Sequence, residues 1–135
     1  MKIRVISSKD EIAQLNPRER VVHLVAPPTA LVLLELIDRC PQLEAIEVHP
    51  SHFERLSTPS LCLLKCQGVK ILPGRTWGPR MDRSVYFTID EGLIMQKAAE
   101  LRAEGLDSEE IVGRVASATG VSPGLVSVIL QRCDG

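Results

Sequence analysis

Short apolar runs alternate with helical patterns through the first part of the chain. Runs rich in aliphatic and β-branched residues predict four strands, at residues 2–7, 19–26, 43–49 and 69–74. Ser8 with the acidic residues behind it predicts a short helix between the first two strands. Further helices are predicted over Ala30–Arg39, between Pro28 and Pro41, and over residues 59–67, with Gly68 as the C-cap.

The alternation of strands and helices predicts parallel strands joined by right-handed crossovers. Strands two to four begin roughly 22–25 residues apart, a period that resembles a leucine-rich repeat as much as a doubly wound sheet. Two and a half units are too few for a stable solenoid, so we expect a small parallel α/β sheet. The segment Ala30–Ile37 is apolar nearly all round, which predicts a helix that is either sandwiched or buried against a partner subunit.

From Asp90 onward the pattern changes to helices with no strands between them. One helix is predicted up to Gly105, a second from an N-cap at Asp107 or Ser108, and a third from an N-cap at Ser122 with Pro123 at its first position. A possible edge strand, residues 84–89, precedes them. We therefore expect a parallel α/β body over residues 1–89 and a three-helix tail over residues 90–135.

The last two helices have the spacing of a helix-turn-helix unit. Ala116 is the small residue at the helix crossing, Gly120 is the turn residue that needs positive φ, and Val126 closes the small core. Val115, Val121 and Ile129 fill the supporting apolar positions. The groove-facing positions of such a unit are Ser122, Pro123, Gly124, Leu125, Ser127, Val128 and Gln131.

These groove-facing residues leave two interpretations open. Ser122, Ser127, Gln131 and Arg132 suit contacts with a phosphate backbone, although no arginine, lysine or asparagine stands where base contacts are made. Leu125 and Val128 are instead expected to form an apolar strip in water, which indicates a protein partner. The tail therefore serves either nucleic-acid binding or packing and oligomerisation.

The distribution of charge along the chain disfavours nucleic-acid binding by the tail. The net charge is −1. Residues 1–83 hold 12 Lys+Arg and 9 Asp+Glu (+3), whereas residues 84–135 hold 4 and 8 (−4), and +3 − 4 = −1. An acidic tail disfavours binding to phosphates. Aromatic residues make up 3% of the chain, so the core must be aliphatic.

Nothing in the sequence marks secretion or a membrane span. The N-terminus has no apolar signal core, and the richest apolar run, residues 30–37, is interrupted by Glu35. We expect a cytoplasmic protein in which the four cysteines, including Cys40 and Cys133, are free thiols.

A loop after the fourth strand gathers three arginines around the single tryptophan. Arg75, Trp77, Arg80 and Arg83 follow a strand of a parallel sheet, where ligands collect in α/β folds. The guanidinium groups suit a phosphate, a carboxylate or a nucleic-acid backbone, with Trp77 as a stacking surface. The alternative is a solvated loop in which Trp77 packs the tail onto the body.

Neither a metal site nor a catalytic centre is predicted. His49, His52, Cys62 and Cys66 follow an H-x2-H…C-x3-C order, but the two cysteines lie in an apolar helix, where small buried thiols are usual. His23, inside a strand, is expected to be satisfied or solvent-facing. No nucleophile-and-base motif or paired-acid signature is present, so we expect a protein that is no enzyme and needs no cofactor.

Several segments together resemble one small protein family. They are "MKIRVISSKDEI", "VVHLVAPP", "CPQLEAIEVHPS", "LPGRTWGPR" and "LRAEGLDSEEIV". The chain resembles an archaeal family known from methanogens and catalogued as a domain of unknown function. The resemblance covers nearly the whole chain and implies a cytoplasmic archaeal protein, but it supplies no activity, cofactor or site residue.

The sequence therefore leads to one functional expectation with two alternatives. We expect a non-enzymatic regulatory protein that associates with nucleic acid through the tail and the arginine loop, and that dimerises through the helix at residues 30–37. The alternatives are a protein-interaction or oligomerisation module and a binder of a small anionic ligand.

Overall fold

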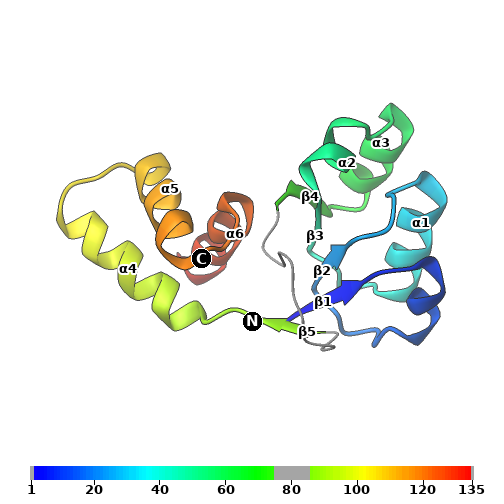
Figure 1. Ribbon diagram of the computed structural model, residues 1–135, viewed down its shortest axis with the longest axis horizontal. Helices are drawn as coiled ribbons and strands as arrows, with labels where there is room; N and C mark the ends of the chain where they lie inside the picture. The colour runs from blue at the N-terminus through cyan, green and yellow to red at the C-terminus, as the bar shows by residue number, and fades with distance from the viewer. Residues whose placement is uncertain (1, 75–85, 135) are drawn as a thin grey trace. The chain divides into compact units, whose positions relative to one another are not determined.

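The computed structural model describes the backbone of residues 2–74 and 86–134, and the side chains of residues 3–74 and 89–131. The chain divides into two compact units, Lys2–Phe87 and Thr88–Gly135, which are described separately below. The first is an α/β body and the second a helical tail (Figure 1). The predicted fold class, a small parallel sheet with crossover helices followed by three helices, is confirmed.

The body is built on a five-stranded sheet in the order β4-β3-β2-β1-β5. Its strands are β1 (Lys2–Ile6), β2 (Val21–Leu24), β3 (Ala45–Val48), β4 (Lys70–Pro73) and β5 (Tyr86–Thr88). The pairs β1–β2, β2–β3 and β3–β4 are parallel, as the sequence predicts. The connections are the 3-10 helix η1 (Lys9–Gln14) and the α-helices α1 (Ala30–Arg39), α2 (Pro50–Glu54) and α3 (Thr58–Cys66).

The four parallel strands lie side by side in chain order, without the reversal of strand order that defines a doubly wound sheet. Right-handed crossovers that all advance in one direction place every connecting helix on the same face. The sheet residues that join the helices in the core are Ile6, Val22, Leu24, Ile46, Val48 and Ile71. Helices α1, α2 and α3 accordingly lie on one side of the strands in Figure 1. The arrangement is closer to the repeat-like alternative than to a doubly wound sheet.

Helix α1 has one buried side and one open side. Thr29 caps its first turn by accepting a hydrogen bond from the backbone N–H of Val32 at 3.3 Å. Leu33 and Leu36 are fully buried, whereas Leu31 and Leu34 are 55% and 51% exposed. The alternative of a helix sandwiched within the chain is therefore wrong, because the one-sided layer of helices covers only the side facing the sheet. Burial of the exposed side against a partner subunit stays a prediction.

The sheet face opposite the helices contains a buried polar pair. His23 and Glu47 are register partners on β2 and β3, and His23 Nδ1 lies 2.7 Å from Glu47 Oε1. Their exposed fractions are 4% and 0%. His23 is thus satisfied, which is one of the two states expected for it. Its acidic partner is 24 residues away in sequence and is brought close only by strand pairing.

The tail consists of α4 (Glu91–Ala103), α5 (Ser108–Thr119) and α6 (Pro123–Asp134), and each helix contacts the other two. Gly105, with φ +87°, follows the end of α4, in agreement with the predicted stop. Among the residues with described structure, no single helix is long and apolar enough to cross a membrane. Helix α5 and residues 123–131 together reach that length and composition only as a pair bent by 117°.

Candidate nucleic-acid interface

Helices α5 and α6 form a bent pair with a three-residue turn. Gly120, Val121 and Ser122 connect them, and the two helices are bent by 117° at this break. Gly120 adopts φ +76° and ψ +5°, the left-handed conformation predicted for the turn. Helix-turn-helix units join helices at about 90–120° through a turn of this length. The pair therefore has the local geometry of that unit.

Side chains form hydrogen bonds with the backbone at both ends of α5 and at the start of α6. Asp107 Oδ1 accepts a hydrogen bond from the backbone N–H of Glu110 at 2.8 Å, so Asp107 is the N-cap. The Thr119 hydroxyl donates to the Val115 carbonyl oxygen at 2.7 Å at the other end. At the start of α6, Ser122 Oγ accepts from the backbone N–H of Leu125 at 3.5 Å, as expected of its N-cap position. These bonds mark both ends of α5 and the start of α6.

The apolar positions predicted for the helix-turn-helix core are buried. They are Val115, Ala116, Val121, Val126 and Ile129, with exposed fractions between 0% and 9%. The small side chain at position 116 allows α6 to approach α5 closely, as the spacing requires. This part of the sequence prediction agrees with the structure.

Within residues 123–131, one narrow band of α6 remains accessible, which we call the exposed stripe. It consists of Pro123, Gly124, Ser127 and Gln131, of which Pro123 and Gln131 are exposed and the other two half-buried. At 3.6 residues per turn, all four lie within about 100° of the helix circumference. The exposed stripe is uncharged, and its small side chains would let a partner backbone approach closely.

The expected apolar strip on α6 is absent. Leu125 and Val128 have exposed fractions of 0% and 6%, so neither side chain lies in water and the premise for a protein interface at these two residues is wrong. The helix-turn-helix spacing predicts that both side chains occupy groove-facing positions in solvent. The buried residues of α6 instead span more than half of the helix circumference. Ser122 is also buried, which leaves Ser127 and Gln131 as the accessible polar residues among the predicted contacts on residues 122–131.

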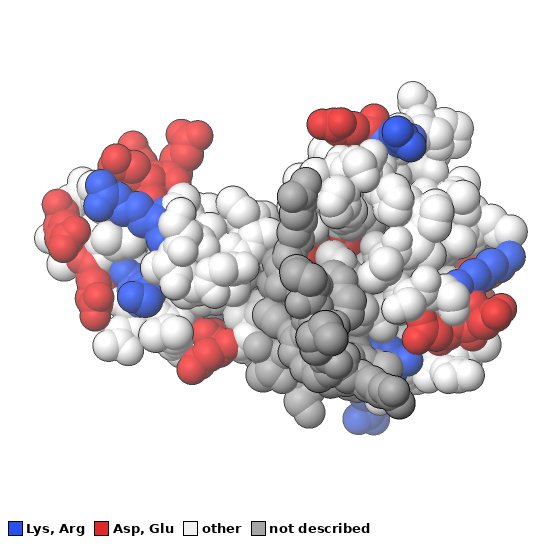
Figure 2. Space-filling view, viewed as in Figure 1, with Lys and Arg blue, Asp and Glu red and all other residues white. Residues whose placement is uncertain are grey.

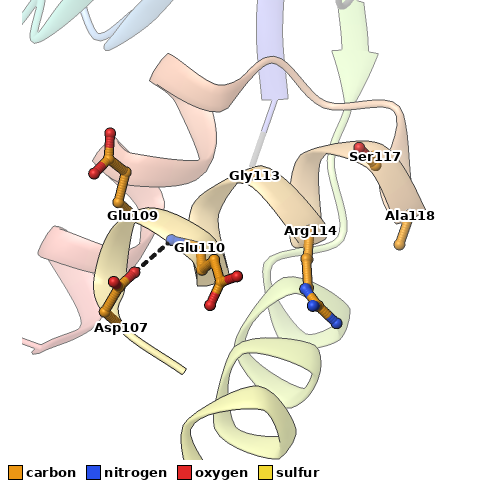
Figure 3. Close-up of a pocket in the computed structure, with 7 residues that line it drawn as sticks. All are labelled: Asp107, Glu109, Glu110, Gly113, Arg114, Ser117 and Ala118. Carbon is orange, nitrogen blue, oxygen red and sulfur yellow. Dashed lines mark hydrogen bonds between the residues drawn. The ribbon is translucent and has the colours of Figure 1, made fainter. Parts of the chain in front are cut away.

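The outward face of α5 forms an open groove of about 990 Å³ (Figure 3). The residues that line it are Asp107, Glu109, Glu110, Gly113, Arg114, Ser117 and Ala118. Three carboxylates at the amino end of the helix interact favourably with its dipole. They also make this end of the groove anionic, since Arg114 is the one basic residue among these described lining residues.

The tail is acidic over its described surface. Residues 89–131 contain seven Asp and Glu against three Lys and Arg, a balance of −4. Acidic side chains, in red, crowd the outer part of the tail in Figure 2. The tail therefore combines the local geometry of a helix-turn-helix unit with an acidic rather than a basic surface.

The arginine loop falls outside the described residues. Arg75, Trp77, Arg80 and Arg83 all lie between residues 75 and 85, and the side chain of Arg132 lies beyond residue 131. The binding of a nucleic acid or a small anion by these residues therefore stays a prediction.

The histidine and cysteine pattern does not form a metal site. Among the described side chains, those of residues 3–74 and 89–131, no group of three metal-ligating residues comes together. His49 instead caps α2, accepting the backbone N–H of Ser51 at 3.1 Å. Cys62 and Cys66 are free and exposed, so the expectation of buried thiols is wrong: the side of α3 that packs on the core is the one bearing Leu64.

Cys40 is the buried thiol of the body. It is free, and burial raises the pKa of its thiol, with a further rise from the nearby Glu19 carboxylate and an opposing effect of Arg39. A thiol in this state is a poor nucleophile, because the thiolate is the reactive form. Cys40 is therefore a packing residue.

Comparison with known proteins assigns a family but no activity. No curated protein and no solved structure matches the chain. A family model described as the N-terminal domain of a family of unknown function, DUF1699, matches residues 2–84. This match covers strands β1 to β4 with their connecting helices and the residues of the arginine loop, and it agrees with the family type expected from the sequence. The chain belongs to the DUF1699 family.

Proposed function

We propose that this protein is a non-enzymatic regulator that associates with nucleic acid through its tail. The observation that supports this function is the 117° bend between α5 and α6 around a left-handed Gly120, with the exposed stripe on the second helix. In helix-turn-helix proteins the second helix enters the major groove with its amino-terminal residues foremost. Cytoplasmic location in an archaeal cell, implied by the resemblance, belongs to the same proposal.

The exposed stripe would contribute shape and hydrogen bonds rather than charge. Pro123 and Gly124 permit close approach, and Ser127 and Gln131 supply polar groups for phosphate or base-edge contacts. Because the described tail carries a balance of −4, attraction to phosphates must come from elsewhere in the chain. We assign that part to the arginine loop, whose sequence contains three arginines and one tryptophan within nine residues, 75–83.

A binding titration with duplex DNA at a series of salt concentrations tests whether the arginine loop supplies the charge and the exposed stripe supplies the close contacts. Removing one arginine that neutralises a phosphate should reduce the slope of log affinity against log salt by about 0.9. We expect Arg75→Ala to lower the slope and the affinity together. Ser127→Glu should abolish binding at all salt concentrations, because it places a carboxylate on the exposed stripe.

Ser117→Glu is the matched control, since Ser117 is an exposed serine on the outward face of α5 rather than on α6. It adds the same charge to the same unit and should weaken binding much less. If the unmodified protein does not bind duplex DNA at low salt, or if both serine variants bind equally well, the proposed function is wrong.

A second candidate, an oligomerisation or protein-interaction module, is favoured by exposed leucines on the body. Leu31, Leu34 and Leu61 are 55%, 51% and 42% exposed, and they belong to two helices that contact each other, α1 and α3. A homodimer through this surface would also space two tails for paired half-sites. Light scattering of Leu34→Glu tests it: a dimer should become a monomer, whereas an unchanged mass for both proteins rejects this candidate.

A further inference from the structure

A cleft of about 440 Å³ lies beside the carboxyl ends of β2 and β3 in the body. It is lined by Pro27, Pro28, Thr29, Ala30, His52, Arg55, Ser57 and Ser60. The first four residues follow β2, and the others follow β3 on α2 and at the start of α3. Ligands of parallel α/β proteins bind at this edge of the sheet, and the volume falls within the range of small-molecule sites.

The side chains that line the cleft are all basic or neutral. Arg55 and His52 are the titratable residues of this described lining, which contains no carboxylate. Arg55 is exposed at the C-cap of α2, and its side chain forms no ion pair with any residue that the structure describes. An arginine that is not neutralised by a neighbouring acid remains available to a bound anion.

His52 adds a buried polar atom with an unmet hydrogen bond. Its Nδ1 is shielded from solvent and has no partner among the described residues, although the ring itself lies edge-on to His49 at a centroid separation of 6.3 Å. Buried polar atoms in native proteins nearly always have a partner, which is often water or a ligand. The half-buried imidazole forms part of the wall of the cleft.

Two helices begin at the cleft. Thr29 is the N-cap of α1, and Ser57, the N-cap of α3, accepts a hydrogen bond from the backbone N–H of Ser60 at 3.3 Å. The Ser57 and Ser60 hydroxyls are also joined at 2.9 Å. Helix amino termini carry partial positive charge, so both helix dipoles add to the field of Arg55.

We propose that this cleft binds a small oxyanion, namely phosphate or the phosphate group of a small molecule. Arg55 supplies the formal charge, the α1 and α3 amino termini supply backbone dipoles, and His52 closes one side. The site lies on the body and does not depend on the function proposed for the tail.

The experiment is an NMR titration of the full chain with inorganic phosphate, at constant ionic strength maintained with chloride. We expect saturable shifts of the amide signals of Ala30 and Ser60, which chloride alone does not produce. Arg55→Gln should weaken phosphate binding about tenfold or more, because glutamine cannot form a charge-assisted bidentate pair with the anion. Arg55→Lys should retain part of the affinity, since lysine keeps the positive charge but lacks the paired N–H donors of the planar guanidinium group.

Arg18→Gln is the matched control, because Arg18 is an exposed arginine that precedes β2 and so lies toward the opposite edge of the sheet. Its phosphate affinity should equal that of the unmodified protein. Ala30→Glu is an independent variant that favours helix formation at the start of α1 yet places a carboxylate in the cleft. It should abolish binding, whereas Leu31→Glu, one residue further and outside the lining, should retain most of it.

Two results would overturn the proposal. The first is the absence of saturable amide shifts in the folded, unmodified protein. The second is equal weakening in Arg55→Gln and Arg18→Gln, which would indicate general attraction of phosphate to a basic surface. Circular dichroism of each variant separates loss of the site from loss of the fold.

Discussion

Replacement by alanine should change the stability of the protein in opposite directions at two glycines, one within α5 and one in the turn that follows it. Gly113 lies inside the helix, while Gly120 ends it with φ +76°. A Cβ added at either position would meet no atom within 4 Å. Steric crowding is therefore excluded at both sites, and the effect of an added methyl group depends on the backbone conformation alone.

The magnitudes follow from the two conformations. At position 113, alanine favours the helix by about 0.5–1 kcal/mol relative to glycine. At position 120, an L-residue in the left-handed region costs about 1–2 kcal/mol. Gly113→Ala and Gly120→Ala have the same amino-acid composition. The expected difference in free energy of unfolding between them, about 2 kcal/mol, therefore reflects the position of the alanine and not its addition to the chain.

Urea unfolding followed by circular dichroism measures this difference, and amide hydrogen exchange in α5 and α6 locates it. We expect Gly113→Ala to unfold at a higher urea concentration than the unmodified protein, and Gly120→Ala at a lower one. Equal midpoints for the two variants would refute the argument, because they would mean that Gly120 does not hold a left-handed turn in solution.

Four further predictions concern the body. Leu36→Ala should lower the free energy of unfolding by about 2–5 kcal/mol, because Leu36 is fully buried, whereas Leu34→Ala on the exposed side of α1 should change it by about 0.5 kcal/mol or less; urea unfolding compares them. Glu47→Ala should lower the free energy of unfolding by about 1–3 kcal/mol in the same assay, since it removes the carboxyl oxygen that lies 2.7 Å from Nδ1 of buried His23. Cys40 should resist alkylation at mildly alkaline pH while exposed Cys62 reacts, as mass spectrometry of labelled peptides would show. Because folding raises the pKa of the Cys40 thiol, its contribution to stability is complete below about pH 9 and is lost as the pH rises further; an unfolding midpoint that does not change with pH in this alkaline range would contradict this.

The elements of this fold are predictable where local chemistry decides them. Helix α1 begins and ends where the proline pair and Pro41 require, and its observed bounds, Ala30–Arg39, equal those predicted. The turn before α6 is identifiable because one glycine at fixed spacing must adopt positive φ. Both features depend on residues close in sequence, which is why the order of residues along the chain is sufficient to predict them.

Features that depend on distant residues are not predictable in this way. The spacing of a helix-turn-helix places Leu125 and Val128 on the open side, yet both are buried. Arg55 carries no motif and becomes a candidate ligand residue only when the fold brings it beside Ala30. The pairing of His23 needs the register of two strands, which no local pattern contains.

The sequential strand order has a consequence for how the protein avoids aggregation. It leaves β4 at one of the two edges of the sheet, with half of its backbone hydrogen-bonding groups directed away from β3. This edge is short, begins with the exposed cation Lys70 and ends with Pro73, which lacks an amide hydrogen. A brief strand with a charge at one end and a proline at the other is a poor template for a strand from another molecule. At the β4 edge, the body can therefore keep an unpaired strand at high concentration without adding strands from its neighbours into a fibre.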